Sequence, residues 1–418
     1  MTLIASLLGL ILGLVMTFSS KDVSAAGFVN LLQGAEAVAQ ANAFVAQADN
    51  PSAVFYNPAG LAFLEGPQAY AGLSLVASKV EYQGLNKEET VDRLQAPPFL
   101  YLSTPLNSRI AGAVGAYSLY GLATVWDSNW TGRYVTTYSR LRTMVTNPTV
   151  AVKLRDNLSF GAGFNIVYAD LNLQRRLWFG SLGLADGHQK LTGDDWGYGY
   201  NLGLLYHWGA MSLGLSYRSK VHLRFKEAEA RFYVPSAVKA YYPDTRATGR
   251  LTLPPMLSAG LALKLTSRLR MEFDLSWTGW STYEEMKIIF SDPLGPPGKS
   301  TRVFIQPKDW QDVLAYRLGV RYQADGYTLM AGYCLDQGPA PSKYRDPQLP
   351  DSNRRILALG ITASPRADFR FSLAYNYIFT RWAPKQNQVL SSLPEPLKAN
   401  GDYRIRVHLL TVGLHFFF

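Results

Sequence analysis

Residues that commonly carry enzymatic or metal chemistry are scarce in this chain of 418 residues. Its single cysteine, Cys334, cannot form an intramolecular disulfide. The histidines are scattered, and none has a Cys or His partner at the spacing of a zinc site; they are His188, His207, His222, His408 and His415. We therefore expect neither a metal nor another cofactor.

Sequence motifs of known enzyme classes are missing as well. The chain has no nucleophile elbow and no phosphate-binding loop. Gly161-Ala162-Gly163 is a weak match to a glycine-rich loop, but it lies inside a predicted strand, where we expect it to allow close packing against an N-terminal plug. The chain is predicted not to be an enzyme, although a hydrolase built from distant Ser, His and Asp residues stays open.

Basic residues are numerous but dispersed. Lys and Arg total 41 against 31 Asp and Glu, a net charge of +10, yet no run of five or more Lys or Arg occurs. Nucleic acid is therefore not predicted as a partner. Only 17% of residues are charged, while 20 Phe, 9 Trp and 25 Tyr make the chain too aromatic to be disordered.

The N-terminus has the pattern of an export signal. An uncharged apolar segment, 3–18, precedes Val23-Ser24-Ala25, a small-x-small pattern of the kind that signal peptidase recognises. We predict a signal peptide over 1–25 and a mature chain that begins at Ala26. Met1-Thr2 lacks the usual basic residue, so a retained anchor helix stays open. Beyond this segment no apolar stretch approaches the ~18–20 residues of a membrane helix.

The remainder of the chain alternates with the period of a β-strand. Segments 158–168, 269–277 and 369–377 each place large apolar residues on one face and small or polar residues on the other. Both a soluble sandwich and a membrane barrel use this pattern. The export signal, strands of nine to eleven residues, aromatic residues near strand ends and a last strand ending in Phe418 favour the barrel.

We therefore predict an all-β fold, a transmembrane antiparallel β-barrel over 67–418. At about 25 residues per strand and loop, this length gives about 14 strands. Residues 26–66 lack the alternation: an Ala-rich, helix-permissive part is followed by the turn Asn57-Pro58-Ala59-Gly60. We expect 26–66 to form a hatch of short helices in the lumen, with an ordinary periplasmic linker as the alternative.

The chain resembles the FadL-type outer-membrane transporters of long-chain fatty acids and other hydrophobic compounds. The resemblance runs in order through the mature chain. The matching segments are Ala26-Gly27-Phe28, Asn57-Pro58-Ala59, 120–124, 158–165, 196–206, 215–221, 253–255 with 277–281, and 339–341 before Pro350-Asp351.

The resemblance implies a 14-stranded barrel that is closed by the hatch. It also implies an inward kink in the third strand, which makes a gap in the wall toward which Asn57-Pro58-Ala59 projects, so that substrate leaves sideways into the membrane. The kink is expected within 109–124, where Gly112, Gly115 and Gly121 weaken strand pairing.

The resemblance further assigns candidate ligand contacts. One carboxylate-binding cation falls on Arg175, and the second falls near Gln306, where the expected lysine is missing and Lys308 is the nearest cation. This departure leaves both a fatty acid and a neutral hydrocarbon open as ligands. Phe28 matches an aromatic residue that lies in the ligand pocket. The Trp126 to Trp130 stretch is expected in the membrane-interface girdle.

The sequence thus predicts passive transport of hydrophobic molecules across the outer membrane of a Gram-negative bacterium by a monomer. The alternatives are a general diffusion porin and a structural outer-membrane protein. The expected partners are a fatty acid or hydrocarbon and the membrane lipids, including lipopolysaccharide, whose phosphates would contact the basic residues of the barrel rim.

Overall fold

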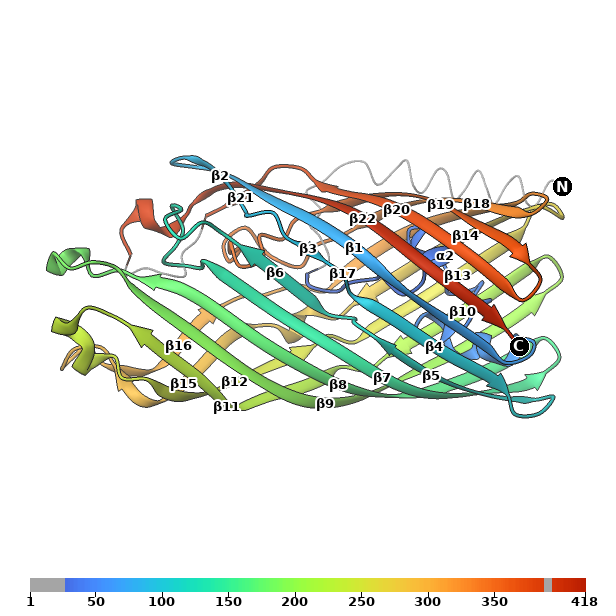
Figure 1. Ribbon diagram of the computed structural model, residues 1–418, viewed down its shortest axis with the longest axis horizontal. Coiled ribbons are helices and arrows are strands. Elements are labelled where there is room, and N and C mark those ends of the chain that lie inside the picture. Colours follow the sequence, from blue (N-terminus) through green and yellow to red (C-terminus); the bar gives the residue numbers. More distant parts are fainter. Residues whose placement is uncertain (1–26, 387–392) are drawn as a thin grey trace.

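A computed structural model describes residues 27–386 and 393–418. The predicted signal peptide, 1–25, lies outside the described residues. Within them the chain forms a closed antiparallel barrel of 14 wall strands, as predicted, and the first wall strand pairs with the last from Gln68↔Phe417 to Gln83↔Asp402 (Figure 1).

Several wall strands consist of two or three consecutive segments. In chain order the walls are β1 (Gln68–Gln83); β2 (Lys87–Glu89), β3 (Leu94–Gln95) and β4 (Pro98–Pro105); β5 (Ile110–Tyr117) and β6 (Gly121–Val125); β7 (Tyr138–Arg155); β8 (Leu158–Leu177); β9 (Gly187–Trp208); β10 (Met211–Arg218) and β11 (Val221–Tyr233); β12 (Thr245–Leu253) and β13 (Met256–Lys264); β14 (Leu269–Thr278) and β15 (Glu285–Leu294); β16 (Thr301–Pro307) and β17 (Val313–Gln323); β18 (Tyr327–Asp336); β19 (Arg354–Arg366); β20 (Phe369–Thr380) and β21 (Ala383–Lys385); and β22 (Gly401–Phe417).

The strands place their polar and apolar residues on the opposite sides from those of a soluble sandwich, in which the apolar residues face inward. On β8, Ser159 and Asn165 are buried toward the lumen, while Phe160 and Phe164 are 39% and 49% exposed on the outside. Polar and small side chains thus face the lumen, and large apolar ones face the surroundings. This arrangement is that of a membrane barrel, in which lipid covers the outward apolar face.

Outward tryptophans mark the height of the apolar band. Trp208 and Trp196 are both exposed on β9 and lie twelve positions apart. At about 3.3 Å per residue and a tilt of about 40°, they are separated by about 30 Å along the barrel axis, close to the thickness of a membrane interior. The short turns 156–157 and 209–210 lie at the Trp208 end, which is the periplasmic end in barrels of this kind.

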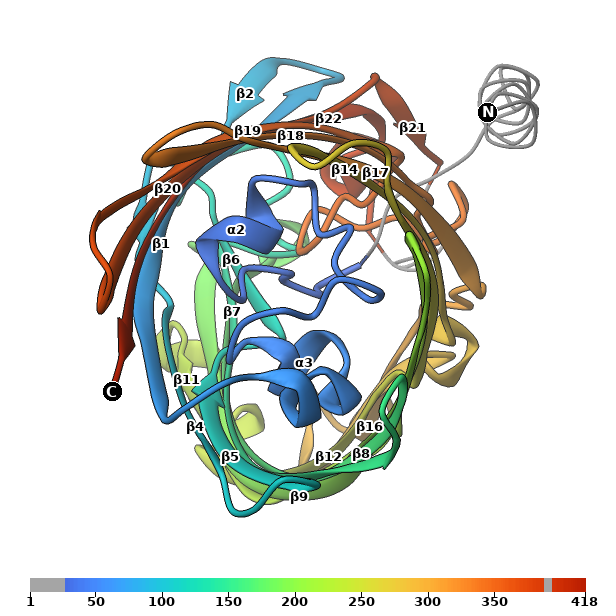
Figure 2. The same cartoon turned by 90° about the vertical axis from the view of Figure 1, so that its right-hand side faces the viewer.

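Residues 27–66 lie inside the barrel (Figure 2). The helices of this segment are short: α2 (Ala35–Val38), α3 (Ala53–Tyr56) and the 3-10 helix η1 (Pro58–Phe63). Four further 3-10 helices lie in connections of the wall: η2 (Gly180–Leu182), η3 (Ser236–Tyr241), η4 (Trp280–Thr282) and η5 (Glu395–Lys398). No helix in the described part of the chain is long and apolar enough to cross a membrane.

Two wall carboxylates hold the hatch in place. Asp274 on β14 accepts the backbone N–H groups of Phe44 (2.8 Å) and Val45 (3.1 Å) through Oδ2. Two residues before it, Glu272 accepts those of Ala46 (2.6 Å) and Gln47 (2.9 Å). Because these four donors are satisfied by the wall, the hatch backbone there needs no helix of its own.

Candidate functional site

A pocket in the extracellular half of the lumen surrounds Arg175 of β8. Its walls are mostly apolar and amide side chains, from Val135, Leu173, Gln174, Gln189, Leu191, Met286, Ile288, Phe304, Gln306 and Gln348. Arg175 donates from Nε to Gln189 Oε1 at 2.8 Å, and its guanidinium lies 4.5 Å from the ring centroid of Phe304. Among the ion pairs of the described residues none involves Arg175, so its charge is free to bind an anion.

Lys308 has a different environment. It forms an ion pair with Asp346, and both side chains are almost fully buried. Gln306 also donates to Asp346, and it lines the Arg175 pocket, whereas Lys308 is not among the lining residues. The structure therefore brings Arg175 and Gln306 together and pairs Lys308 with an acid that sequence reasoning missed. Asp346 lies in an irregular connection, whose packing leaves no periodic signal.

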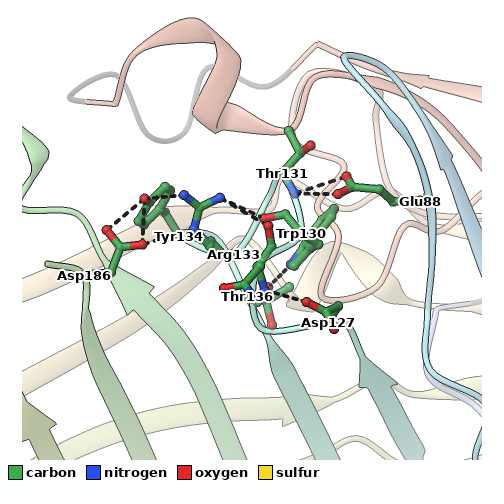
Figure 3. Close-up of polar contacts among 9 residues, drawn as sticks. Glu88, Asp127, Trp130, Thr131, Arg133, Tyr134, Thr136 and Asp186 are labelled. Carbon is green, nitrogen blue, oxygen red and sulfur yellow. Dashed lines mark hydrogen bonds and ion pairs between the residues drawn. The ribbon is translucent and has the colours of Figure 1, made fainter.

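A loop over 126–137 contributes Val135 to the lining of the pocket. On one side of this loop Arg133 pairs with Asp186 at 3.1 Å, and on the other the backbone N–H of Thr131 donates to Glu88 (Figure 3). Trp126 and Trp130 stack at 4.0 Å and are 3% and 2% exposed. The expectation that these tryptophans belong to the membrane girdle is therefore wrong, because they are buried against Tyr82 and Tyr403.

Phe28 is buried among four aromatic rings. The ring centroids of Trp280, Trp310, Tyr283 and Tyr120 lie 4.7, 5.9, 6.0 and 6.1 Å from its own. This aromatic cage is separate from the residues that line the Arg175 pocket. The placement of Phe28 thus fits a packing residue that would have to move before it contacted a ligand there.

The residue before Phe28 is fixed to the connection between β18 and β19. Gly27 has a φ of 62°, and a Cβ at this position would lie 2.4 Å from Trp280. Its carbonyl oxygen accepts a hydrogen bond from Nη2 of Arg354 at 2.6 Å, and its N–H donates to the carboxyl of Asp351. Burial raises the pKa of the Asp351 carboxyl to about 7, although Arg354 and Arg345 oppose this shift.

The third wall strand is interrupted at 118–120. Tyr117, the last residue of β5, pairs with Val145 of β7, and Gly121, the first of β6, pairs with Arg142. The interruption lies inside the expected interval 109–124 and ends at Gly121. Gly112 and Gly115 lie before it, where β5 pairs regularly with Val150 and Asn147 of β7.

The first hatch residues supply hydrogen bonds at this interruption. The Asn30 N–H donates to Leu119 O at 2.7 Å, and the Gly121 N–H donates to Phe28 O at 3.0 Å. The side chain of Gln33 donates to Ser118 O at 2.5 Å. Residues 28–33, which we call the bridging segment, therefore take the place of a ladder partner where the wall strand lacks one.

The Asn57-Pro58-Ala59 turn packs against other wall strands. Asn57 donates to Leu204 O of β9 at 3.1 Å, and its side-chain oxygen accepts the Ala59 N–H at 3.2 Å. A Cβ on Gly161 of β8 would lie 2.3 Å from the Pro58 carbonyl carbon. The predicted close packing of Gly161 against the plug is confirmed. The hatch residues that bond to the interrupted strand are those of the bridging segment.

Comparison with known proteins agrees with this architecture. Residues 16–418 match the family described as outer membrane protein transport protein (OMPP1/FadL/TodX). The chain is 26% identical over 399 residues to a long-chain fatty acid transport protein of Salmonella typhi, covering 86% of this chain and 87% of that protein. It is 24% identical to outer membrane protein P1 of Haemophilus influenzae, covering 86% and 85%.

Solved structures share the fold. A Pseudomonas aeruginosa FadL homologue superposes with a TM-score of 0.82 at 19% identity, covering 94% of this chain and 100% of that one. The toluene transporter TodX of P. putida gives a TM-score of 0.70 at 20% identity, covering 93% and 99%. The predicted family and the predicted outer-membrane location are thereby confirmed: this chain belongs to the OMPP1/FadL/TodX family of outer membrane transport proteins.

Proposed function

We propose that this protein carries fatty acids passively across the outer membrane, binding them in the Arg175 pocket and releasing them sideways at 118–120. The observation that carries the proposal is the interruption of the third strand, where the bridging segment completes the hydrogen bonding. The bridging segment belongs to the hatch, so its withdrawal opens the wall without breaking any pair between wall strands.

The contents of the pocket favour an acid over a neutral hydrocarbon. A carboxylate can accept two hydrogen bonds from the unpaired guanidinium of Arg175, while the alkyl tail lies on Leu173, Leu191 and Ile288. The Salmonella typhi relative is named for long-chain fatty acids and TodX for toluene, so both ligand classes occur among similar proteins. In this protein the unpaired charge of Arg175 favours the fatty acid over the neutral hydrocarbon.

Lateral release suits an apolar tail. A route through a water-filled axial pore would expose the tail at about 25 cal/mol per Å2, whereas a route into the membrane keeps it away from water. The lumen is occupied by the hatch, which disfavours the alternative of a general diffusion porin. The wall closes on itself through β1 and β22, and we propose that it works as a monomer.

A disulfide across the bridging segment tests the route. Val29 and Tyr120 face one another in an isolated antiparallel bridge, a geometry that a disulfide can span. In cells lacking the native gene, Val29→Cys/Tyr120→Cys should lose uptake of a labelled long-chain fatty acid when oxidised and regain it on reduction, because the oxidised segment cannot leave the wall.

The matched control is Ser74→Cys/Thr411→Cys, which joins directly opposite lumenal positions of β1 and β22 whose hydroxyls lie 2.8 Å apart. These two strands are paired along their whole length, so oxidation there should leave uptake unchanged. Full uptake by the oxidised Val29/Tyr120 pair would contradict release at the interruption.

A further inference from the structure

Three cationic side chains form a row on the outside of the barrel. Arg224 of β11 lies directly opposite Arg250 of β12, and the pairing Gly249↔Ile288 places Lys287 of β15 opposite Arg250 in turn. All three residues are exposed. We call them the basic row. Like charges at directly opposed positions of a sheet repel one another, so this arrangement costs stability unless an anion lies between them.

Within the described residues no carboxylate forms an ion pair with the basic row, although Asp195 lies beside it and accepts the backbone N–H of Arg224. None of the ion pairs in the described part of the chain includes these three residues. Glu229, the outward acid farther along β11, is paired with Arg231 at 2.9 Å. Glu285, two residues before Lys287, forms no ion pair with it. The row therefore presents three charges that remain available to an external anion.

The height of the row on the barrel restricts what that anion can be. The Arg224 N–H bonds to the side chain of Asp195, which places Arg224 beside Trp196, the outer limit of the apolar band. Next to the row on the periplasmic side lie His222 and Thr252, which share a hydrogen bond. Farther toward the periplasm the outward surface becomes apolar and aromatic: Tyr200 and Leu257 are 47% and 41% exposed, and Tyr217 lies opposite Leu257. A ligand that spans both regions would need negative charge at one end and apolar chains at the other.

We propose that the basic row binds the phosphates of lipopolysaccharide in the outer leaflet, with its acyl chains against Tyr200, Tyr217 and Leu257. Arginine holds a phosphate by paired hydrogen bonds, and three neighbouring cations match a lipid that carries more than one phosphate. The site lies on the lipid face of the wall, apart from the lumen, and does not depend on the transported ligand.

The test compares two triple variants with the same change of charge. Arg224→Gln/Arg250→Gln/Lys287→Gln removes the basic row, and Arg109→Gln/Arg155→Gln/Lys264→Gln removes three exposed cations at the periplasmic end. Each protein is extracted from outer membranes in mild detergent, and bound lipid A is counted by native mass spectrometry. Wild type and control should retain lipid A, and the basic-row variant should retain at least fivefold less.

Thermal unfolding in detergent shows whether the basic row binds lipopolysaccharide or free inorganic phosphate. Added lipopolysaccharide should raise the unfolding temperature of wild type and control but not of the basic-row variant, and dephosphorylated lipid A or inorganic phosphate should have little effect on any of them. Heat-dependent migration in gels verifies that each barrel is folded. Equal retention of lipid A by both variants, or equal stabilisation by inorganic phosphate, would overturn the proposal.

Discussion

At the scale of single residues, we propose that Arg175 gives the pocket its preference for an acid. A hydrogen bond to a charged group contributes about 1.5–3 kcal/mol, so Arg175→Gln should weaken binding of a long-chain fatty acid by roughly 10–100-fold. Binding of the fatty alcohol of equal length should change little, because it carries no charge. Arg175→Lys should restore part of the affinity for the acid. Ligand titration by fluorescence measures all three, and an equal loss for acid and alcohol would contradict a carboxylate contact.

We expect Asp351 to make the anchoring of Gly27 sensitive to pH. Its carboxyl has a pKa of about 7 in the folded protein because burial disfavours the charge, against an ordinary value near 3.8. Between these values the folded state holds the proton more tightly than the unfolded state. The contribution of Asp351 to stability is therefore complete below about pH 4 and is lost as the pH rises through 7.

Hydrogen exchange of the residues that follow Gly27 measures this effect. Their protection, corrected for intrinsic exchange, should fall between pH 4 and pH 7 in the wild type and stay level in Asp351→Asn, whose amide cannot ionise. The same pH dependence in both proteins would assign it to another group.

The contacts of Lys308 show why the environments of single residues could be predicted only in part from the sequence. The resemblance located Arg175 and noted the missing lysine at Gln306, but nothing in the sequence indicated that Lys308 is paired with Asp346. The two residues are 38 positions apart, and the acid lies in a connection without periodicity. Contacts of this kind depend on loop packing, which has no local pattern.

At the scale of elements, the strands were predictable because lipid on one side and the lumen on the other impose a period of two. Segments 158–168, 269–277 and 369–377 lie in β8, β14 and β20 as predicted. The Ala-rich part of the hatch forms less helix than its composition permits: α2 ends at Val38, and Ala41 and Asn42 have positive φ. The four residues that follow this part, 44–47, bond instead to wall carboxylates that are distant in sequence.

Those carboxylates give a prediction about the hatch as an element. Glu272→Gln/Asp274→Asn replaces the carboxyl oxygens that accept four hydrogen bonds from residues 44–47 by amides, so the hatch should loosen while the wall stays paired. We expect several-fold faster proteolysis within 27–66 and a larger single-channel conductance in planar bilayers. The outward Asp170→Asn, which breaks ion pairs with Arg140 and Arg142, serves as the control and should change neither measurement.

At the scale of the whole molecule, we expect Phe418 to matter for assembly into the outer membrane but not for the stability of the folded barrel. Phe418 lies beyond the end of β22 and is 79% exposed, although its N–H donates to Pro67 O. Its side chain therefore adds little to the folded wall. A terminal aromatic residue on an amphipathic strand nevertheless resembles the address that outer-membrane assembly machinery recognises.

Phe418→Ser should therefore lower the amount of protein in the outer membrane several-fold, while the purified, refolded barrel unfolds at the same urea concentration as the wild type. Leu85→Ser, which removes an apolar side chain of similar exposure (69%) from the hairpin between β1 and β2, should change neither quantity. A matching fall in urea resistance would mean that Phe418 stabilises the closed wall. An unchanged membrane level would mean that the remaining outward residues of β22, such as Phe416 and Leu410, suffice for assembly.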